Sequence, residues 1–471
     1  MLVSKKFKII ASLIITFVLG LVAVSGHRIY LFEIQKKPLN NSSRVIEANF
    51  FNFDAKYFSI APRNQTNISA TKQISENKTL IFTSNRKSSI LKKFIYNPNL
   101  GSIDGALKFS NNINIETLAP IVKEHKNNYF IFDLLIDGDF LLVSLVTIPN
   151  MANSCDIFQI IKIPIIKSNL VPSGASQVWK SNVCIHTYPN DPGWGDFQGR
   201  LAVSKYNIYM SAGLLIASTY LGFYPNLNVS GLNEDLTTEI KNYQLFGGVI
   251  KINKTTGTSS RIAQGFRGPS GLAIKTTPLG EQIWLVDHGP RGGDELNLVI
   301  EGKDYGWPWV SYGRKYFDAT KGQKGIINTK FGTHTGYEEP IYYWTPSIAP
   351  SQLIVLPKTL DNDSSWSAGD IVVSSLKAKS IFRLKLDANL KIQSIEQVEI
   401  GARIRDISVE NTTIFISTDD GRVVVLEKND IPTSLGPFPA VNIVNDPFYL
   451  AIPGFVRFSK FIDSMITRIL N

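Results

Sequence analysis

Short strand-like runs separated by turn residues recur along this chain, and this recurrence restricts the fold more than any other feature of the sequence. Six runs rich in β-branched and aromatic residues lie at 79–83, 140–146, 207–211, 282–286, 370–375 and 412–418. Turn sequences such as Asp137-Gly138-Asp139 bound several of them, and four are followed by a second strand-like run. Helical periodicity is nearly absent between the runs. The pattern therefore predicts an all-β protein.

The number of strand-rich units favours one all-β architecture. Six roughly regular units fit a six-bladed β-propeller, in which sheets of about four strands surround an axis. A pair of β-sandwiches is the structural alternative, and it explains the recurrence less well. We therefore expect a propeller at 73–430, preceded by a linker at 31–72 and followed by a tail at 431–471.

Residues 1–30 determine the compartment that we expect. Lys5, Lys6 and Lys8 precede a charge-free apolar stretch at 9–25, close to the shortest length that crosses a bilayer. The lysines should stay cytoplasmic, so that the rest of the chain is exported. The segment is either a retained signal anchor, forming a transmembrane helix, or a cleaved signal peptide. We expect a membrane-anchored propeller on the extracytoplasmic (periplasmic or extracellular) side in the first case, and a secreted one in the second.

The tail repeats apolar residues at helical spacing. These run from Phe455 to Ile469, with basic residues such as Arg457 and Lys460 between them. The spacing predicts a C-terminal amphipathic helix. It either packs against the propeller or lies on the membrane surface.

Composition excludes several other classes of protein. The two cysteines, Cys155 and Cys184, are too few for a disulfide-rich scaffold or a cysteine-based zinc cluster. An oxidising compartment would allow them to form a disulfide, and two buried thiols are the alternative. The net charge of +10 is dispersed and lacks an interleaved aromatic stripe, so we expect no nucleic-acid partner.

Three neighbouring segments carry a more specific signal. They are 265–272 (GFRGPSGL), 284–298 (WLVDHGPRGGDELNL) and 305–308 (YGWP). Together they resemble the soluble quinoprotein glucose dehydrogenase and aldose sugar dehydrogenase family, which shares the glucose/sorbosone dehydrogenase domain. The resemblance extends over about 72–427 and is weak before Gly199. It implies a six-bladed propeller that binds pyrroloquinoline quinone (PQQ) and calcium (Ca2+) over its axial face and oxidises aldose sugars.

The implied cofactor carries three carboxylates, so its site must supply positive charge. Arg403 and Arg405 are two residues apart on an expected extended segment, which places both guanidinium groups on one face and suits bidentate binding of carboxylates. Solvated charges on an edge strand are the alternative. The resemblance adds Arg267 and Lys377 from neighbouring blades. Trp344 offers a flat surface on which a quinone or a sugar can stack, unless it is buried in the core.

A glycine-rich loop provides the expected metal ligands. In the family, the main-chain carbonyls at the positions of Gly289 and Pro290 hold the calcium ion. Calcium prefers oxygen ligands, so carbonyl groups suffice. Asp294 and Glu295 follow in the same loop and either bind a second metal or fix the loop by hydrogen bonds.

The chain departs from the family pattern at the catalytic base. The family has a histidine three residues before Gly-Arg-Leu, and this chain has Asp196 there. An aspartate with a pKa of about 3.9 is a weak base unless burial raises that pKa. Gly268 also replaces an asparagine that touches the cofactor in the family, and 210–214 lacks the usual Gly-Asp pair. Three alternatives follow. Asp196 is the base and has a raised pKa, or His186 takes the place of the base, or the site is not catalytic.

Two functions therefore compete. The first is a membrane-tethered PQQ-dependent aldose dehydrogenase that transfers hydride from a sugar to the quinone and passes electrons to a membrane acceptor. The alternative is a catalytically inactive propeller of the same family that binds a carbohydrate or a protein partner.

Overall fold

The computed structural model describes most of the chain between residues 42 and 429. The described ranges are 42–47, 52–61, 67–85, 90–104, 112–114, 129–147, 157–181, 198–213, 247–314, 329–357 and 366–429. The chain divides into two compact units, Met1–Pro432 and Thr433–Asn471. All of the described residues belong to the first unit.

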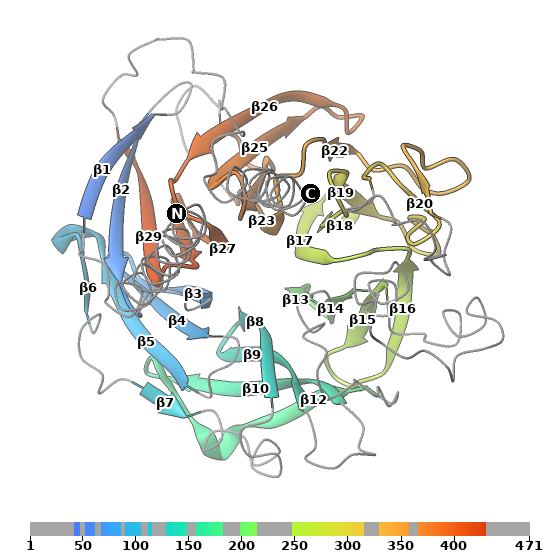
Figure 1. Cartoon of the computed structure of the whole chain (residues 1–471). Coiled ribbons are helices and arrows are strands. Elements are labelled where there is room, and N and C mark those ends of the chain that lie inside the picture. Colours follow the sequence, from blue (N-terminus) through green and yellow to red (C-terminus); the bar gives the residue numbers. More distant parts are fainter. Residues whose placement is uncertain are drawn as a thin grey trace, which may run out of the picture. The chain divides into compact units, whose positions relative to one another are not determined.

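Six antiparallel sheets surround a central axis and form a six-bladed β-propeller (Figure 1). The first blade contains β3 (Asn67–Ser75), β4 (Lys78–Asn85), β5 (Ile90–Asn97), β6 (Ser102–Asp104) and β7 (Asn112–Asn114). The second contains β8 (Tyr129–Asp137), β9 (Phe140–Thr147), β10 (Ile157–Ile166), β11 (Asn169–Leu170) and β12 (Ser176–Lys180). The third contains β13 (Gln198–Val203), β14 (Asn207–Ala212), β15 (Gly248–Asn253) and β16 (Ser259–Gln264). The fourth blade contains β17 (Pro269–Thr277), β18 (Gly280–Asp287), β19 (Asp294–Val299) and β22 (Tyr342–Trp344). The fifth contains β23 (Pro350–Val355), β24 (Ile371–Ser375), β25 (Ser380–Leu386) and β26 (Ile392–Glu399).

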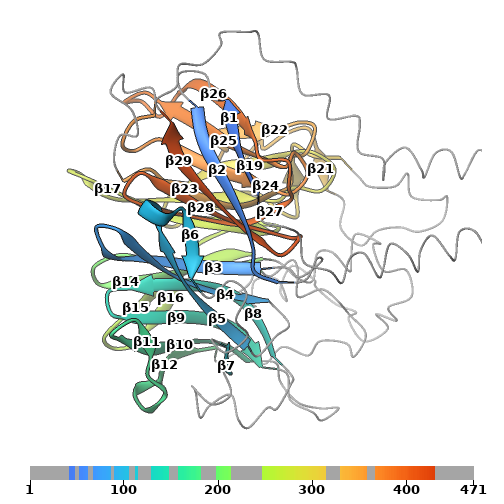
Figure 2. The ribbon, with the colours of Figure 1, turned by 90° about the vertical axis from the view of Figure 1, so that its left-hand side faces the viewer.

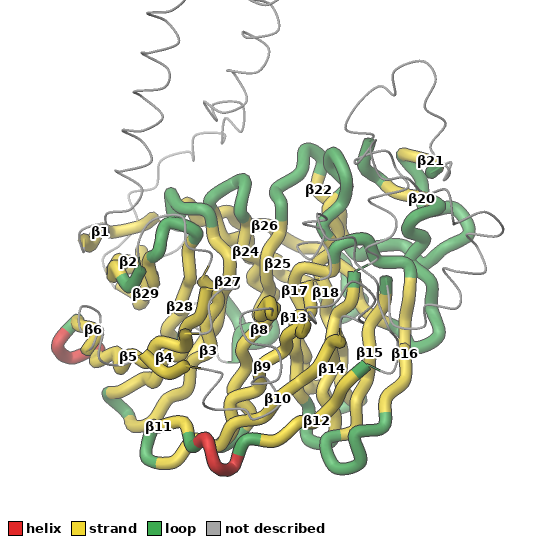
Figure 3. Tube along the Cα trace, turned by 60° about the horizontal axis from the view of Figure 1, so that its bottom comes forward, coloured by secondary structure: helices red, strands yellow, loops and turns green. Residues whose placement is uncertain are grey.

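The sixth blade joins the two ends of the described chain. It contains β27 (Ile404–Glu410), β28 (Thr413–Thr418), β29 (Arg422–Asn429), β2 (Asn52–Ser59) and β1 (Ser42–Glu47). Two short parallel strands, β20 (Val310–Ser311) and β21 (Lys330–Phe331), lie outside the blades. The 3-10 turns η1 (Pro98–Leu100) and η3 (Pro172–Gly174) are the red segments in Figure 3.

Each of the six predicted runs coincides with the second strand of a blade, namely β4, β9, β14, β18, β24 and β28. These strands have neighbours on both edges, and their side chains are buried on both faces along most of β9 and β14. Continuous burial requires continuous apolar character, which makes such strands conspicuous in a sequence. The all-β propeller expectation is therefore confirmed.

The N-terminal part of the propeller differs from the expectation for residues 31–72. We expected a linker there, but the structure places β1 and β2 in this range, and β2 pairs with β29 along its whole length, from Asn52↔Asn429 to Ser59↔Arg422. Figure 1 shows these blue and red strands side by side. Phe53, Ala55 and Tyr57 alternate with polar residues and are buried. This short alternation closes the ring, and the polar residues around it conceal it in the sequence.

Buried serines tie four of the six blades, the second to the fifth, to the blade that follows. Their hydroxyl groups donate to carbonyls at the beginning of the following inner strand: Ser144 to Gly199, Ser211 to Pro269, Ser270 to Pro350, and Ser351 to Ile404, over 2.6–2.8 Å. The inner strands β3, β8, β13, β17, β23 and β27 contact one another in sequence around the axis. Figure 2 shows the ring turned by 90°. These bonds fix the blades where the candidate site lies.

Several predictions fall outside the described residues. These concern the helices at 1–30 and 431–471 and the pairing of Cys155 with Cys184. Within the part of the chain that the structure describes, no helix has the length and apolar character needed to span a bilayer.

Candidate functional site

The predicted cations lie at one end of the propeller axis, which we call the cation face. It is the end at which the inner strands begin and at which the second strand of each blade turns into the third. Arg267 immediately precedes β17, Arg403 precedes β27, and Lys377 lies between β24 and β25. The 288–293 loop joins β18 to β19 at the same end. The topology therefore gathers these groups from three different blades.

Arg403 and Arg405 converge on one carboxylate. Nε and Nη2 of Arg405 donate to the two oxygens of Asp419, each over 3.0 Å, while Nε of Arg403 donates to the same carboxylate over 3.2 Å. Arg405 is 19% exposed and Arg403 is 49% exposed. The bidentate contact holds Arg405 in one orientation. Sequence reasoning missed Asp419, although it lies in the Asp-Asp-Gly turn that follows β28.

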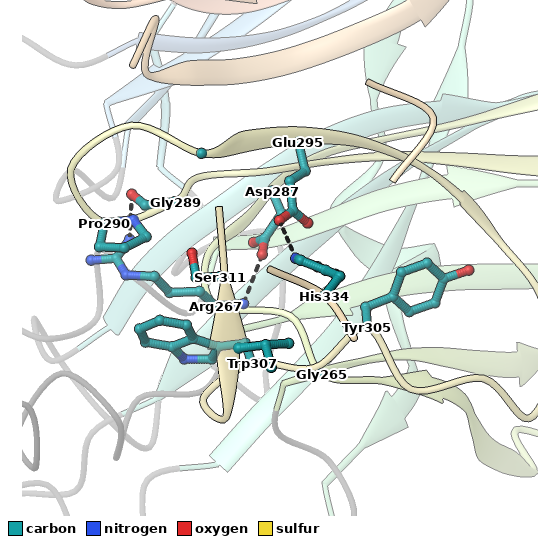
Figure 4. Close-up of a pocket in the computed structure, with 12 residues that line it drawn as sticks. Gly265, Arg267, Asp287, Gly289, Pro290, Glu295, Tyr305, Trp307, Ser311 and His334 are labelled. Atoms are coloured by element: carbon teal, nitrogen blue, oxygen red, sulfur yellow. Dashed lines mark hydrogen bonds and ion pairs between the residues drawn. The ribbon is translucent and has the colours of Figure 1, made fainter. Parts of the chain in front are cut away.

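Arg267 contacts the glycine-rich loop directly. Its Nη1 donates to the carbonyl of His288 over 2.7 Å and approaches the carbonyl of Gly289 at 3.3 Å. The guanidinium lies 5.7 Å from the ring centre of Trp307, within the range of a cation–π interaction. The buried Nε1 of Trp307 has no hydrogen-bond partner among the described residues. This corner therefore presents a guanidinium and an unused N–H donor together (Figure 4).

Asp294 fixes the loop by hydrogen bonds. Its carboxylate accepts from the backbone N–H of Gly289 (3.0 Å), from the hydroxyl of Ser347 (2.7 Å), and from the N–H groups of Ile348 and Ala349 (2.8 Å each). Burial alone would raise the pKa of Asp294, but the nearby His288 and these donors lower it below its ordinary value. The contacts support the loop-fixing role.

The glycines of the loop are required by its close packing. A Cβ atom on Gly289 would lie 2.3 Å from the carbonyl oxygen of Gly293. A Cβ atom on Gly293 would lie 2.2 Å from the backbone nitrogen of Gly313, and Gly293 also has a φ of +67°. Any larger residue would force the backbone segments apart. The loop therefore presents its carbonyls in a single, crowded arrangement.

A cluster of buried titratable groups lies behind the loop. Nε2 of His334 is 2.8 Å from Oε1 of Glu295, and Asp287 accepts from the N–H groups of Arg267 (2.9 Å) and Gly268 (2.7 Å). Burial and the nearby Glu295 raise the pKa of Asp287 to about 7. These groups line a cavity of about 10 Å³, room for roughly one water molecule. Sequence reasoning missed His334 because 35 residues or more separate it from the loop motif.

The remaining predicted site residues differ in where they lie and in how far they are exposed. Gly268 is buried, and its carbonyl accepts from the N–H of His288 over 2.8 Å. The backbone N–H of Lys377 donates to Ile348 over 3.1 Å, and the residue is partly exposed. Trp344 is 6% exposed and packs edge-on against Phe382, and its carbonyl accepts from the N–H of Gly293 over 2.8 Å. Asp196 and His186 lie outside the described residues.

The described contacts leave little freedom for a metal at the loop. Two nitrogens already contact the Gly289 carbonyl oxygen: Nη1 of Arg267 at 3.3 Å and Nδ1 of His288 at 2.9 Å. A cation bound to this oxygen would have to displace both of them. Glu295 is paired with His334, and Asp294 is fully engaged. The described residues contain no group of three or more His, Cys, Asp or Glu side chains that could hold a metal ion. The loop as described therefore does not fit a bound calcium ion.

The same contacts suit an anionic, flat cofactor better. Arg267 offers donors on one side of the cation face, and the half-exposed Arg403 with the oriented Arg405 offers donors on another. Carboxylates are the natural partners of such guanidinium groups. The donor set fits a polycarboxylate such as PQQ.

Comparison with known proteins agrees with this geometry. The profile of the glucose/sorbosone dehydrogenase family matches residues 249–426, which include the loop and all four cations. Over these residues the chain is similar to the glucose/sorbosone dehydrogenase family. The aldose sugar dehydrogenase of Escherichia coli is 31% identical over 171 residues, which cover 36% of this chain and 43% of the relative.

Two further relatives match over similar lengths. An uncharacterized protein of Synechocystis is 35% identical over 166 residues, which cover 35% of this chain and 38% of the relative. Quinoprotein glucose dehydrogenase B of Acinetobacter calcoaceticus is 26% identical over 265 residues, which cover 46% of this chain and 52% of the relative. The matched regions thus span about half or less of these relatives.

Solved structures share the fold over a larger part of the chain. A crystal structure of a glucose dehydrogenase superposes with a TM-score of 0.55 at 18% identity, covering 79% of this chain and 98% of that chain. The soluble aldose sugar dehydrogenase of Escherichia coli, in its apo form, gives 0.54 at 19% identity, covering 80% and 100%. At such identities the agreement establishes the propeller fold alone.

Proposed function

We propose that this chain is a PQQ-dependent aldose sugar dehydrogenase. The observation that carries the proposal is the gathering of Arg267, Arg403 and Arg405 at one end of the axis, with Asp419 orienting the last two. The names of two relatives, an aldose sugar dehydrogenase and a quinoprotein glucose dehydrogenase, support the choice of substrate and cofactor class.

The residues of this chain have separable roles in the proposed reaction. Arg403 and Arg405 bind carboxylates of the cofactor, and Arg267 binds it from a neighbouring blade. Asp294 holds the loop against Ile348 and Ala349. When bound, the quinone supplies an acceptor for the hydride that leaves the anomeric carbon of the sugar. Asp196 or His186 takes the proton of the anomeric hydroxyl.

A dye-reduction assay tests this function. Purified full-length protein is incubated with PQQ and Ca2+, and reduction of an artificial electron acceptor is followed after addition of aldoses. We expect aldose-dependent reduction in the parent, and loss of turnover with unchanged PQQ affinity in Asp196→Ala if Asp196 is the base. PQQ binding without turnover at saturation would contradict the enzyme and support the inactive, ligand-binding propeller.

We also propose that the chain is exported and that residues 9–25 tether it to the membrane, where a membrane component accepts the electrons. The lysine cluster followed by the apolar stretch motivates this proposal. Fractionation of cells and N-terminal sequencing of the mature protein test it. A soluble product whose N-terminus lies beyond Ser25 would show that the segment is cleaved.

A further inference from the structure

The inner strands carry β-bulges where they begin at the cation face. The pairing register shifts near the start of five inner strands, and the residues left between the flanking pairs are Phe132 in β8, Gly199 and Arg200 in β13, Ser270 in β17, Ser351 in β23, and Arg405 in β27. A bulge leaves its extra residue without its usual partner in the ladder. Several backbone carbonyls near the axis therefore need another donor.

The guanidinium of Arg200 supplies these donors. Nε donates to the carbonyl of Ser270 over 3.0 Å, and Nη2 donates to the carbonyls of Ser351 and Arg405 over 2.8 Å each. All three acceptors are the bulged residues of their strands. One side chain thus satisfies three bulges in three blades.

Two carboxylates complete the surroundings of this guanidinium. Nη1 of Arg200 lies 2.9 Å from Oδ1 of Asp133 and 3.3 Å from Oδ1 of Asp406. The second oxygen of Asp406 accepts from the N–H of Ser69 in β3, over 2.7 Å. The Arg200 side chain has no exposed surface. Its five N–H donors are all used, and the network reaches all six inner strands.

This network lies directly beneath the candidate site. Arg405 is both the bulged residue whose carbonyl Arg200 holds and the residue whose side chain forms the bidentate contact with Asp419. Ser270 follows Arg267 by three residues. The direction of a bulged side chain depends on the conformation of its own peptide group, so a donor fixed on the carbonyl also fixes the side chain.

We propose that Arg200 is a positioning residue, which holds the β27 bulge so that the guanidinium of Arg405 points at the cation face. The expectation that loss of Arg200 weakens cofactor binding rests on the proposed function. The expectation that Arg200 orients the Arg405 side chain does not. Arginine is required because its rigid fork reaches two carboxylates and three carbonyls at once. A lysine ammonium keeps the charge but has only three donors at a single point.

Chemical modification tests the positioning without any cofactor. Full-length apoprotein is treated with phenylglyoxal, which reacts with accessible arginines, and the modification rates of Arg405 and Arg403 are read by peptide mass spectrometry. In Arg200→Lys we expect Arg405 to react roughly three- to tenfold faster, the change that corresponds to loss of a hydrogen bond of ordinary strength. Arg403 also contacts Asp419, so the exposed Arg291 of the 288–293 loop is read in the same spectra as the internal reference.

A matched control separates positioning from stability. Arg383 is also a buried arginine bound to two carboxylates, Asp370 at 2.9 Å and Glu396 at 3.1 Å, but it lies in β25, away from the axis. Arg383→Lys should lower the melting temperature without changing the Arg405 rate. An equal increase in both variants, or an unchanged rate in a folded Arg200→Lys, would overturn the proposal.

Two further measurements keep the test decisive. If Arg200→Lys does not fold, the triple variant Arg200→Met/Asp133→Asn/Asp406→Asn removes the buried charges together, and the same faster Arg405 modification is expected. With PQQ, Arg200→Lys should weaken binding in the parent background and not in Arg405→Ala. Additive losses would contradict the proposal. A parent that does not bind PQQ would refute the proposed function while the modification rates still decide the role of Arg200.

Discussion

Nη1 of Arg200 and Oδ1 of Asp133 form an ion pair of 2.9 Å in which neither side chain is more than 2% exposed. The pair joins β13 to β8 at the propeller axis, and Asp406 extends it to β27. Arg200→Met leaves both carboxylates buried without their cation, so we expect the free energy of unfolding to fall by about 3–5 kcal/mol. Urea unfolding measures the loss. A loss below about 1 kcal/mol would show that water or a rearranged side chain replaces the guanidinium.

The two carboxylates at the axis also make stability depend on pH. Burial raises the pKa of Asp406, Arg200 lowers it, and Asp133 raises it again, with a net increase from 3.8 to about 6. The folded state therefore binds this proton more tightly than the unfolded state. Its contribution to stability is complete below pH 3.8 and is lost as the pH rises through 6.

Asp406→Asn should remove this part of the pH dependence. Relative to the variant, the parent should lose up to about 3 kcal/mol of stability between pH 4 and pH 7. The difference between the two urea-unfolding profiles is the relevant quantity, because groups away from the axis titrate equally in both proteins. Parallel profiles would show that the axial carboxylates share no proton in this range.

Gly293 in the 288–293 loop and Gly302 in the turn after β19 allow the cost of steric crowding to be separated from the cost of a left-handed backbone. Gly293 and Gly302 have φ values of +67° and +83°, but only at Gly293 would a Cβ atom meet a neighbour, the Gly313 nitrogen at 2.2 Å. Gly302→Ala should cost about 1–2 kcal/mol, from the left-handed backbone alone. Gly293→Ala should cost clearly more and should also weaken PQQ binding. Equal melting temperatures for the two variants would mean that the loop yields to the added methyl group.

The cation face makes a graded prediction for PQQ affinity. Arg405→Ala should weaken binding by about 10- to 100-fold, the usual value of a charge-assisted hydrogen bond. Arg403→Ala should have a smaller effect, because that side chain is half exposed and touches Asp419 through Nε alone. Lys391→Ala, in the exposed turn between β25 and β26 at the opposite end of the blade, is the charge control. Equal effects of all three substitutions would indicate a nonspecific response to net charge.

Much of the propeller can be predicted from the sequence because its second strands are buried on both faces. β9, β14 and β28 appear as short runs rich in apolar residues for this reason. β2 was missed because its inward-facing Phe53, Ala55 and Tyr57 alternate with polar residues, and its partner β29 lies more than 360 residues away. Local patterns contain no information on such distant pairing.

In the candidate site, too, residues in local motifs were predicted and residues that depend on distant contacts were missed. Arg403 and Arg405 were found because their spacing and a family motif point to them, whereas Asp419 and His334 depend on contacts across loops. Trp344 was expected either to stack on a quinone or sugar or to be buried in the core, and its contact with Phe382 and 6% exposure agree with the second alternative. Arg200 was noticed only as part of Gly-Arg-Leu, since nothing in a sequence shows that three distant bulges share one donor.

The antiparallel match of β2 with β29 has a consequence for how the molecule is made. The sixth sheet combines two strands from the N-terminal end of the described chain with three from its C-terminal end, so the ring stays open during synthesis until Arg422–Asn429 has left the ribosome. Until then the nascent protein has exposed strand edges on both sides of the gap, which are the kind of edges that aggregate. A premature stop codon before β29 would therefore abolish ring closure itself, leaving an open, adhesive arc in place of a slightly shortened protein.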